Sequence, residues 1–69
     1  MIEVFKTNVQ DSSEAEIIIK KLLEHFPEAK INFDLEDYDK ILRIENNYIK
    51  PENIIKILNS FFFKCEILE

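Results

Sequence analysis

The apolar residues of this chain follow two different periods. Residues 2–9 are rich in β-branched and aromatic side chains, which favours a strand. The next apolar residues instead recur at the three- and four-residue spacing of one helical face: Ala15, Ile18, Ile19, Leu22 and Phe26. A strand followed by an amphipathic helix is therefore predicted for the first third of the chain.

The residues at the two ends of this segment predict where the helix begins and ends. Asp11 or Ser12 can cap the N-terminus, and Glu14 follows Asp11 at the spacing of a capping box. Pro27 disfavours helical geometry at Phe26 and is expected to end the helix there.

The middle of the chain alternates strictly between apolar and polar residues. Ile31, Phe33 and Leu35 alternate with polar neighbours, which predicts a strand with one solvent-facing side. Residues 36–39 form a polar turn, and residues 40–45 form a second strand with Leu42 and Ile44 on one face. The short separation of these two strands predicts a hairpin.

The last third repeats the helix–strand order. Pro51 suits the first position of a helix, and Ile49 and Ile54 have the spacing of a hydrophobic staple around it. Residues 64–68 then predict a short final strand that contains Cys65.

The element order is therefore βαββαβ. We expect one α+β domain over residues 1–69 with a ferredoxin-like arrangement. In this fold a four-stranded antiparallel sheet, in strand order 4-1-3-2, carries two helices on one face.

Composition and charge narrow the function classes. The net charge is −5, with nine basic residues scattered among fourteen acidic ones, so we expect no nucleic-acid partner and no anionic membrane surface. Glycine is absent, which excludes the glycine-rich loops that cradle phosphates. We also find no apolar run that could span a membrane and no secretory signal, and Cys65 has no second cysteine to pair with. These features predict a cytoplasmic protein.

Four features carry a family resemblance. Residues 26–35 contain an apolar-x-apolar-Asp-Leu pattern, Leu42 and Ile44 form a core pair, residues 51–58 form an amphipathic helix, and Phe62-Phe63 follows it. Together they resemble the heavy-metal-associated domain of copper chaperones and metal-transporting ATPases, many members of which have Gly-Tyr where Phe62-Phe63 stands. The resemblance covers nearly the whole chain and implies the same βαββαβ fold.

The metal-binding motif of that family, Gly-Met-x-Cys-x-x-Cys, falls on residues 8–14 of this chain. Its cysteines correspond to Asp11 and Glu14, and its methionine corresponds to Val9. The resemblance implies that thiolates at these positions would bind a soft ion such as Cu(I). Carboxylates suit hard ions instead, but two are too few for the six or more oxygens that Mg²⁺ or Ca²⁺ requires. We expect Asp11 and Glu14 to cap the helix, with no metal and no cofactor.

Neither of the two candidate nucleophile or base residues stands in a catalytic pattern. Cys65 is expected to be a small apolar core residue, with Lys64 on the opposite face of the strand and no obvious cationic neighbour to lower its pKa. His25 lies near the end of the first predicted helix, where a solvated or dipole-paired imidazole is expected. We predict no catalytic residues.

Three consecutive phenylalanines, residues 61–63, form the most apolar stretch. Successive residues point in different directions, so one of the three must point away from the core. We expect Phe62 or Phe63 to close over the loop at residues 8–14 or to contact a partner.

One face of the predicted sheet has no helix to cover it. We expect this face to carry four apolar residues that lie near one another: Ile2, Val4, Ile41 and Leu68. Between them we expect polar and charged ones: Lys6, Asn32, Asp34, Arg43, Lys64 and Glu66. A contiguous apolar patch indicates a binding surface, so a second copy or another protein is the expected partner.

Three hypotheses for function follow. The first is a non-catalytic protein-interaction or structural module with a degenerate metal loop. The second is a divergent metal carrier that uses Asp11 and Glu14, and the third is a regulatory domain that binds a small molecule. An enzyme is not expected, because the acylphosphatases of this fold need an arginine in the loop after the first strand and residues 8–13 contain none.

Overall fold

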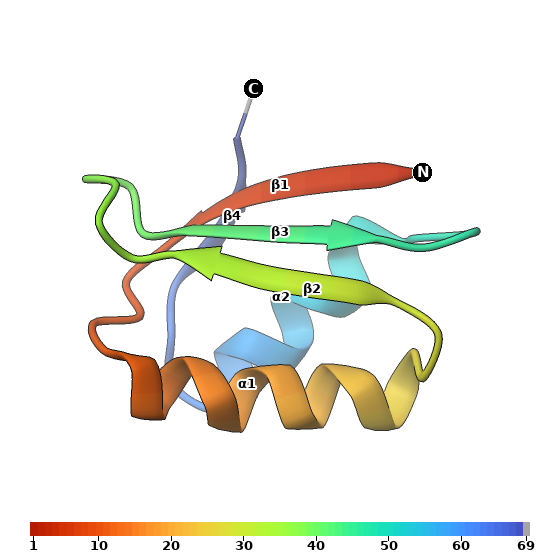
Figure 1. Cartoon of the computed structure of the whole chain (residues 1–69), viewed down its shortest axis with the longest axis horizontal. Helices are drawn as coiled ribbons and strands as arrows, with labels where there is room; N and C mark the ends of the chain where they lie inside the picture. Colours follow the sequence, from red (N-terminus) through yellow and green to blue (C-terminus); the bar gives the residue numbers. More distant parts are fainter. Residues whose placement is uncertain (69) are drawn as a thin grey trace.

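The computed structural model describes residues 1–68. Its elements follow the predicted order: β1 (Ile2–Thr7), α1 (Ser12–His25), β2 (Lys30–Asp34), β3 (Ile41–Glu45), α2 (Pro51–Ser60) and β4 (Cys65–Ile67). The strands form one antiparallel sheet in the order β2-β3-β1-β4, which is the predicted 4-1-3-2 read from the opposite edge. Both helices lie on the same side of this sheet (Figure 1), which confirms the α+β ferredoxin-like layout.

The start of α1 is fixed by a reciprocal pair of carboxylates. The Oδ1 atom of Asp11 accepts a hydrogen bond from the Glu14 backbone N–H at 2.9 Å. The Oε1 atom of Glu14 reaches back to the Gln10 backbone N–H, also at 2.9 Å. This is a capping box displaced by one residue, because the second bond goes to the residue before the cap. The predicted capping role of Asp11 and Glu14 is thus confirmed.

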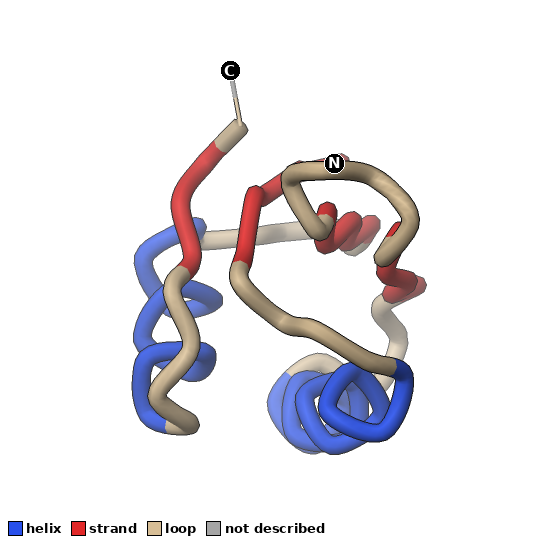
Figure 2. Tube along the Cα trace, turned by 90° about the vertical axis from the view of Figure 1, so that its left-hand side faces the viewer, coloured by secondary structure: helices blue, strands red, loops and turns tan. Residues whose placement is uncertain are grey.

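The sheet and the two helices form separate layers (Figure 2), and the buried residues of both contribute to a single apolar core. Four elements, β1, α1, β3 and α2, contribute its fully buried side chains, whereas β2 contributes half-buried ones. The fully buried residues of these four elements are Phe5, Ile18, Leu22, Leu42, Ile44, Ile54 and Leu58. Burying one such side chain contributes about 1.5–3 kcal/mol. No buried polar or charged residue occurs among residues 1–68, so the core is held by apolar packing alone.

Three strands are shorter than the sequence predicts, and one of them, β3, begins at Ile41 rather than residue 40. β1 ends at Thr7 rather than Val9, because the Thr7 hydroxyl accepts from the Val9 N–H at 3.2 Å and turns the chain out of the sheet. Val9 is nevertheless fully buried. The edge strand β4 spans Cys65–Ile67 rather than residues 64–68. The Lys64 N–H instead donates to the Asn8 side-chain oxygen at 2.7 Å.

α2 begins at Pro51, as predicted, and Ile49 and Ile54 on either side of its start are both buried. Its C-terminus is formed without glycine. The Phe62 N–H donates to the Asn59 carbonyl at 2.9 Å and the Phe63 N–H donates to the Leu58 carbonyl at 3.0 Å. These two bonds define a Schellman motif, and Phe62 occupies its left-handed position with a φ of 69°.

Candidate interaction surface

The face of the sheet opposite the helices carries a cluster of aliphatic side chains centred on Val4. Val4 lies opposite Arg43 of β3, and its carbonyl accepts a hydrogen bond from the Leu68 N–H at 2.9 Å. Ile41 lies opposite Lys6, the next β1 residue on the same face, which places Ile41 diagonally from Val4. Ile2 precedes Val4 by two residues and shares its face. The strand register therefore brings together the four apolar residues expected on this surface.

No helix covers these four residues, and Ile2 and Ile41 lie on opposite sides of Val4 along the strands. Ile2 is 48% exposed, whereas Val4, Ile41 and Leu68 are each half-buried. A depression of about 430 Å³ lies beside the cluster, over β3 and its two neighbouring strands, and it is lined in part by Val4, Ile41 and Arg43. We call the four aliphatic residues and the strand residues around them the uncovered face.

Charged side chains of both signs surround the aliphatic cluster. Lys6 and Glu66, which are opposite each other in the β1–β4 pairing, form an ion pair at 3.5 Å. The β2–β3 register places Asp34 beside Ile41 and Asn32 beside Arg43, as expected, and it adds Lys30 and Glu45 to this face. The uncovered face is thus an aliphatic centre with a mixed-charge border, the arrangement that protein interfaces have.

The loop between β1 and α1 uses its carboxylates within the chain. Besides its bond to the Glu14 N–H, the Asp11 Oδ1 atom accepts from the Ser13 hydroxyl at 2.8 Å. Hydrogen bonds from the Glu14 backbone and then from Ser13 lower the pKa of Asp11 from its usual value of 3.8. Within residues 1–68, no group of three or more histidine, cysteine or acidic side chains is arranged to hold a metal ion. The geometry of this loop is that of a helix cap.

Cys65 lies in the core, as expected, with 7% of its surface exposed. Burial raises the pKa of its thiol to about 12, and the nearby negative charge of Glu66 also raises this pKa. The thiol therefore stays protonated at neutral pH, and only the thiolate is an effective nucleophile or metal ligand.

The three phenylalanines after α2 separate, as expected from their consecutive positions. Phe61 and Phe63 pack against the core, whereas Phe62 is 94% exposed. Phe62 does not close over the loop at residues 8–14, because its left-handed backbone turns the side chain outward. The contact between these two segments is instead the hydrogen bond from the Lys64 N–H to the Asn8 side chain.

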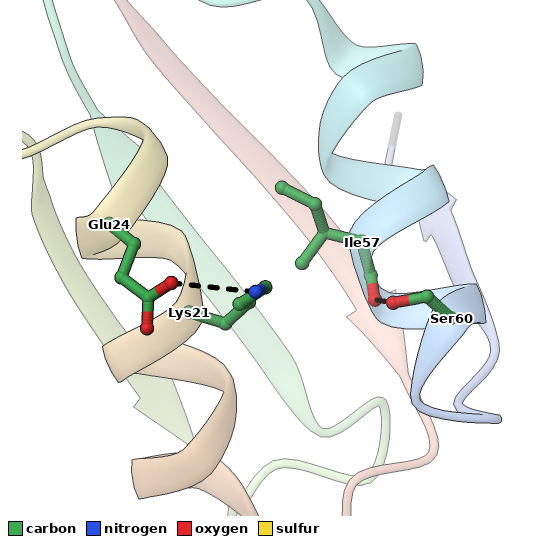
Figure 3. Close-up of polar contacts among 4 residues, drawn as sticks. All are labelled: Lys21, Glu24, Ile57 and Ser60. Carbon is green, nitrogen blue, oxygen red and sulfur yellow. Dashed lines mark hydrogen bonds and ion pairs between the residues drawn. The ribbon is translucent and has the colours of Figure 1, made fainter.

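The outer surface of the helices is held by short local contacts. Figure 3 shows Lys21 paired with Glu24 on α1 at 3.4 Å, and the Ser60 hydroxyl donating to the Ile57 carbonyl on α2 at 2.6 Å. His25 is the last residue of α1 and is exposed. The centre of its ring lies 6.2 Å from that of Phe26, with the two rings tilted against each other. Ile17 is 53% exposed on this side of the molecule.

Sequence reasoning missed two strongly exposed aromatic residues. Tyr38 is 95% exposed in the loop between β2 and β3, and Tyr48 is 64% exposed before α2. The only available signal was their place in polar loop segments.

Comparisons of the chain with family models, with curated proteins and with solved structures gave no match. The resemblance to the heavy-metal-associated domain therefore stays a prediction. Across residues 1–68, neither helix is long and apolar enough to cross a membrane.

Proposed function

We propose that this protein is a non-catalytic protein-interaction module that binds its partner through the uncovered face of the sheet. The observation that carries this proposal is the cluster of Ile2, Val4, Ile41 and Leu68 on a surface without helices. Antiparallel sheets with one solvated face usually carry polar side chains there. In β1, two of the three residues on that face are aliphatic instead.

The remaining chemistry of the chain supports a binding role. The Cys65 thiol is buried and has a pKa raised to about 12. Asp11 and Glu14 are engaged in capping α1. We also propose that the chain is a relative of the heavy-metal-associated domain in which the loop after β1 has a structural role; the strand order β2-β3-β1-β4 supports this.

A site-specific photocrosslinker tests the proposed surface. Ile41 is replaced by a benzophenone-bearing amino acid on the uncovered face, and Ile17 is replaced in the same way on the exposed side of α1. In cells that make the protein, we expect one defined protein adduct from position 41 and none from position 17. The partner identified by mass spectrometry is then purified and titrated against the wild type and Val4→Glu.

Val4→Glu should weaken binding of the purified partner at least tenfold, because it places a charge in the aliphatic centre of the interface. The matched variant Ile17→Glu adds the same charge to α1 and should bind like the wild type. Equal adducts from positions 41 and 17, or an affinity unchanged by Val4→Glu, would refute the proposed function.

A further inference from the structure

β2 is an edge strand, and the backbone groups on its outer side are unpaired within residues 1–68. The Asn46 N–H donates to the Met1 carbonyl, and hydrogen-bonded pairs alternate with non-bonded pairs along antiparallel strands. By this alternation the even-numbered residues of β3 bond to β1, and its odd-numbered residues bond to the even-numbered residues of β2. Ile31 and Phe33 therefore direct their N–H and C=O groups away from the sheet.

This edge has few of the features that keep strands from pairing with other chains. β4, at the opposite edge, has three residues, whereas β2 has five. β2 contains no proline, and its register with β3 is uninterrupted, so no bulge twists the edge away. A regular strand with free backbone groups is a template for the addition of another strand.

We infer that the β2 edge pairs with the β2 edge of a second copy of this chain, antiparallel and centred on Asn32. The two four-stranded sheets then join into one continuous sheet. This edge is a different surface from the uncovered face, so the inference does not depend on the function proposed above.

The sequence of β2, Lys-Ile-Asn-Phe-Asp, is complementary to itself when it is reversed. With a two-fold axis at Asn32, Ile31 faces Phe33 of the other copy, and the two residues exchange both backbone hydrogen bonds. Lys30 faces Asp34 of the other copy, at a non-bonded position where side chains lie closest, and the axis repeats this pair. Asn32 faces its own counterpart, and each amide has both a donor and an acceptor for the other.

The charges select this register over its neighbours. An axis at Ile31 sets Asp34 against Glu28, which is a like-charged pair, and an axis at Phe33 separates Asp34 from the lysine. In the proposed register the nearest like charges are Glu28 and Glu36, and both lie in loops beyond the ends of β2. Such an isologous contact closes on itself and gives a dimer rather than a filament.

α1 adds an apolar contact beside the same edge. His25 and Phe26 line a depression together with residues of α2, so this side of α1 faces α2. Ile19 and Leu23 lie one turn apart on the other side of α1, and Leu23 is 38% exposed. Figure 2 shows α1 beneath the β2 side of the sheet and α2 beneath the β4 side. The two-fold axis therefore sets the two α1 helices side by side, with Ile19 and Leu23 between them.

The size and charge of this contact set its strength. It includes one strand edge and one helix flank, which is at the small end of specific interfaces. The exposed charges beside the apolar pair on α1, Glu16 and Lys20, are of opposite sign. The net charge of −5 on each copy opposes association, but at about 0.15 M salt this repulsion is screened beyond roughly 8 Å. We expect a reversible dimer with a Kd of roughly 10–500 μM.

Sedimentation equilibrium of the full chain between about 5 μM and 2 mM tests the inference, a range chosen to bracket that Kd. The mass should rise with concentration from 8.3 kDa toward twice that value. Asn32→Lys sets two like charges against each other at the axis and should raise the Kd roughly tenfold or more. Asn59→Lys adds the same charge to the exposed surface of α2 and should dimerise like the wild type.

A charge exchange tests the register. Lys30→Asp or Asp34→Lys alone places like charges at two symmetric contacts and should raise the Kd roughly five- to thirtyfold. The double variant restores both pairs and should return the Kd to near the wild-type value. Asp34 also accepts a bond from the Asp37 N–H at 3.3 Å, but a loss of loop structure would not be restored by changing Lys30.

Amide hydrogen exchange followed by NMR locates the contact at the backbone groups that form it. The N–H groups of Ile31 and Phe33 should exchange roughly three- to tenfold more slowly at about 2 mM than at about 20 μM, because pairing protects them. The N–H of Asn32 already bonds to β3 and is the internal control, so its exchange should not depend on concentration.

Each outcome bears on a separate statement. A monomer at every concentration refutes the inference, and the crosslinking experiment still decides the proposed function. A dimer that persists unchanged in Asn32→Lys, or that leaves exchange at Ile31 and Phe33 unaltered, places the contact elsewhere and also refutes it. A dimer that Asn32→Lys abolishes, but that the double charge variant does not restore, overturns the register centred on Asn32.

Discussion

Replacing Phe62 by glycine should stabilise this protein, although it removes a large aromatic side chain. Phe62 occupies the left-handed position of the Schellman motif after α2, with a φ of 69°. Holding an L-residue in this conformation costs roughly 1–2 kcal/mol. The side chain is 94% exposed, so almost no packing is lost on removing it.

The gain is reduced because glycine has more conformational freedom in the unfolded chain, a term of about 0.5–1 kcal/mol. The net effect expected for Phe62→Gly is a rise of about 0.5–1 kcal/mol in the free energy of unfolding. In a domain of this size that corresponds to an increase in Tm of roughly 2–8 °C.

Urea unfolding followed by circular dichroism measures this difference, with Phe62→Ala as the matched control. Alanine removes the aromatic ring but keeps the Cβ atom that disfavours positive φ, so Phe62→Ala should unfold close to the wild type. The reasoning is wrong if glycine is no more stabilising than alanine. It is also wrong if both variants are destabilised by several kcal/mol, since that would show that the ring packs in the folded protein.

Three further predictions concern single contacts. Cys65 should react with a thiol reagent at pH 8 only through unfolding, because burial holds its pKa near 12; rapid labelling of the native protein would contradict this. The contribution of Asp11 to stability is present above the usual pKa of 3.8 and lost as the pH falls through its lowered folded value. Urea midpoints between about pH 2 and 6 should therefore fall less steeply on acidification in Asp11→Ala than in the wild type. Asn8→Ala removes the acceptor of the 2.7 Å hydrogen bond from the Lys64 N–H. It should lower the free energy of unfolding by about 0.5–1.5 kcal/mol and speed amide exchange at Lys64. Unchanged exchange would show that the bond is not formed in solution.

The features that the sequence predicted correctly rest on local patterns. The spacing from Asp11 to Glu14 predicted the cap of α1, and Pro51 predicted the start of α2. The alternation around Leu42 and Ile44 predicted which side of β3 is buried. The order of the elements then determined the strand order, because few arrangements of βαββαβ units bury both helices on one sheet.

The features that the sequence did not predict are of two kinds. Some depend on residues far apart in the chain, and others occur without the glycine that usually marks them. Nothing in the local sequence predicts that Asn8 bonds to Lys64, which lies 56 positions away. Glycine usually marks positions of positive φ, and this chain contains no glycine. The positive φ angles of Lys40 and Phe62 could therefore not be predicted from the sequence. The sequence predicted the strand order but not the register of the strands on the uncovered face. Register depends on the lengths of the connecting loops, and the pattern did not define these lengths.

The end of β1 supports both of these positive-φ residues. The Thr7 hydroxyl donates to the Lys40 carbonyl at 2.6 Å, and the Lys40 N–H bonds to Asp37 at 3.0 Å. Next to it, Asn8 accepts from the Lys64 N–H two residues after Phe62. Strained backbone persists only where its surroundings determine it more strongly than the local preference does. The segment at residues 7–14 is therefore a structural junction in this chain. Its side chains cap α1 and hold the turns before β3 and after α2.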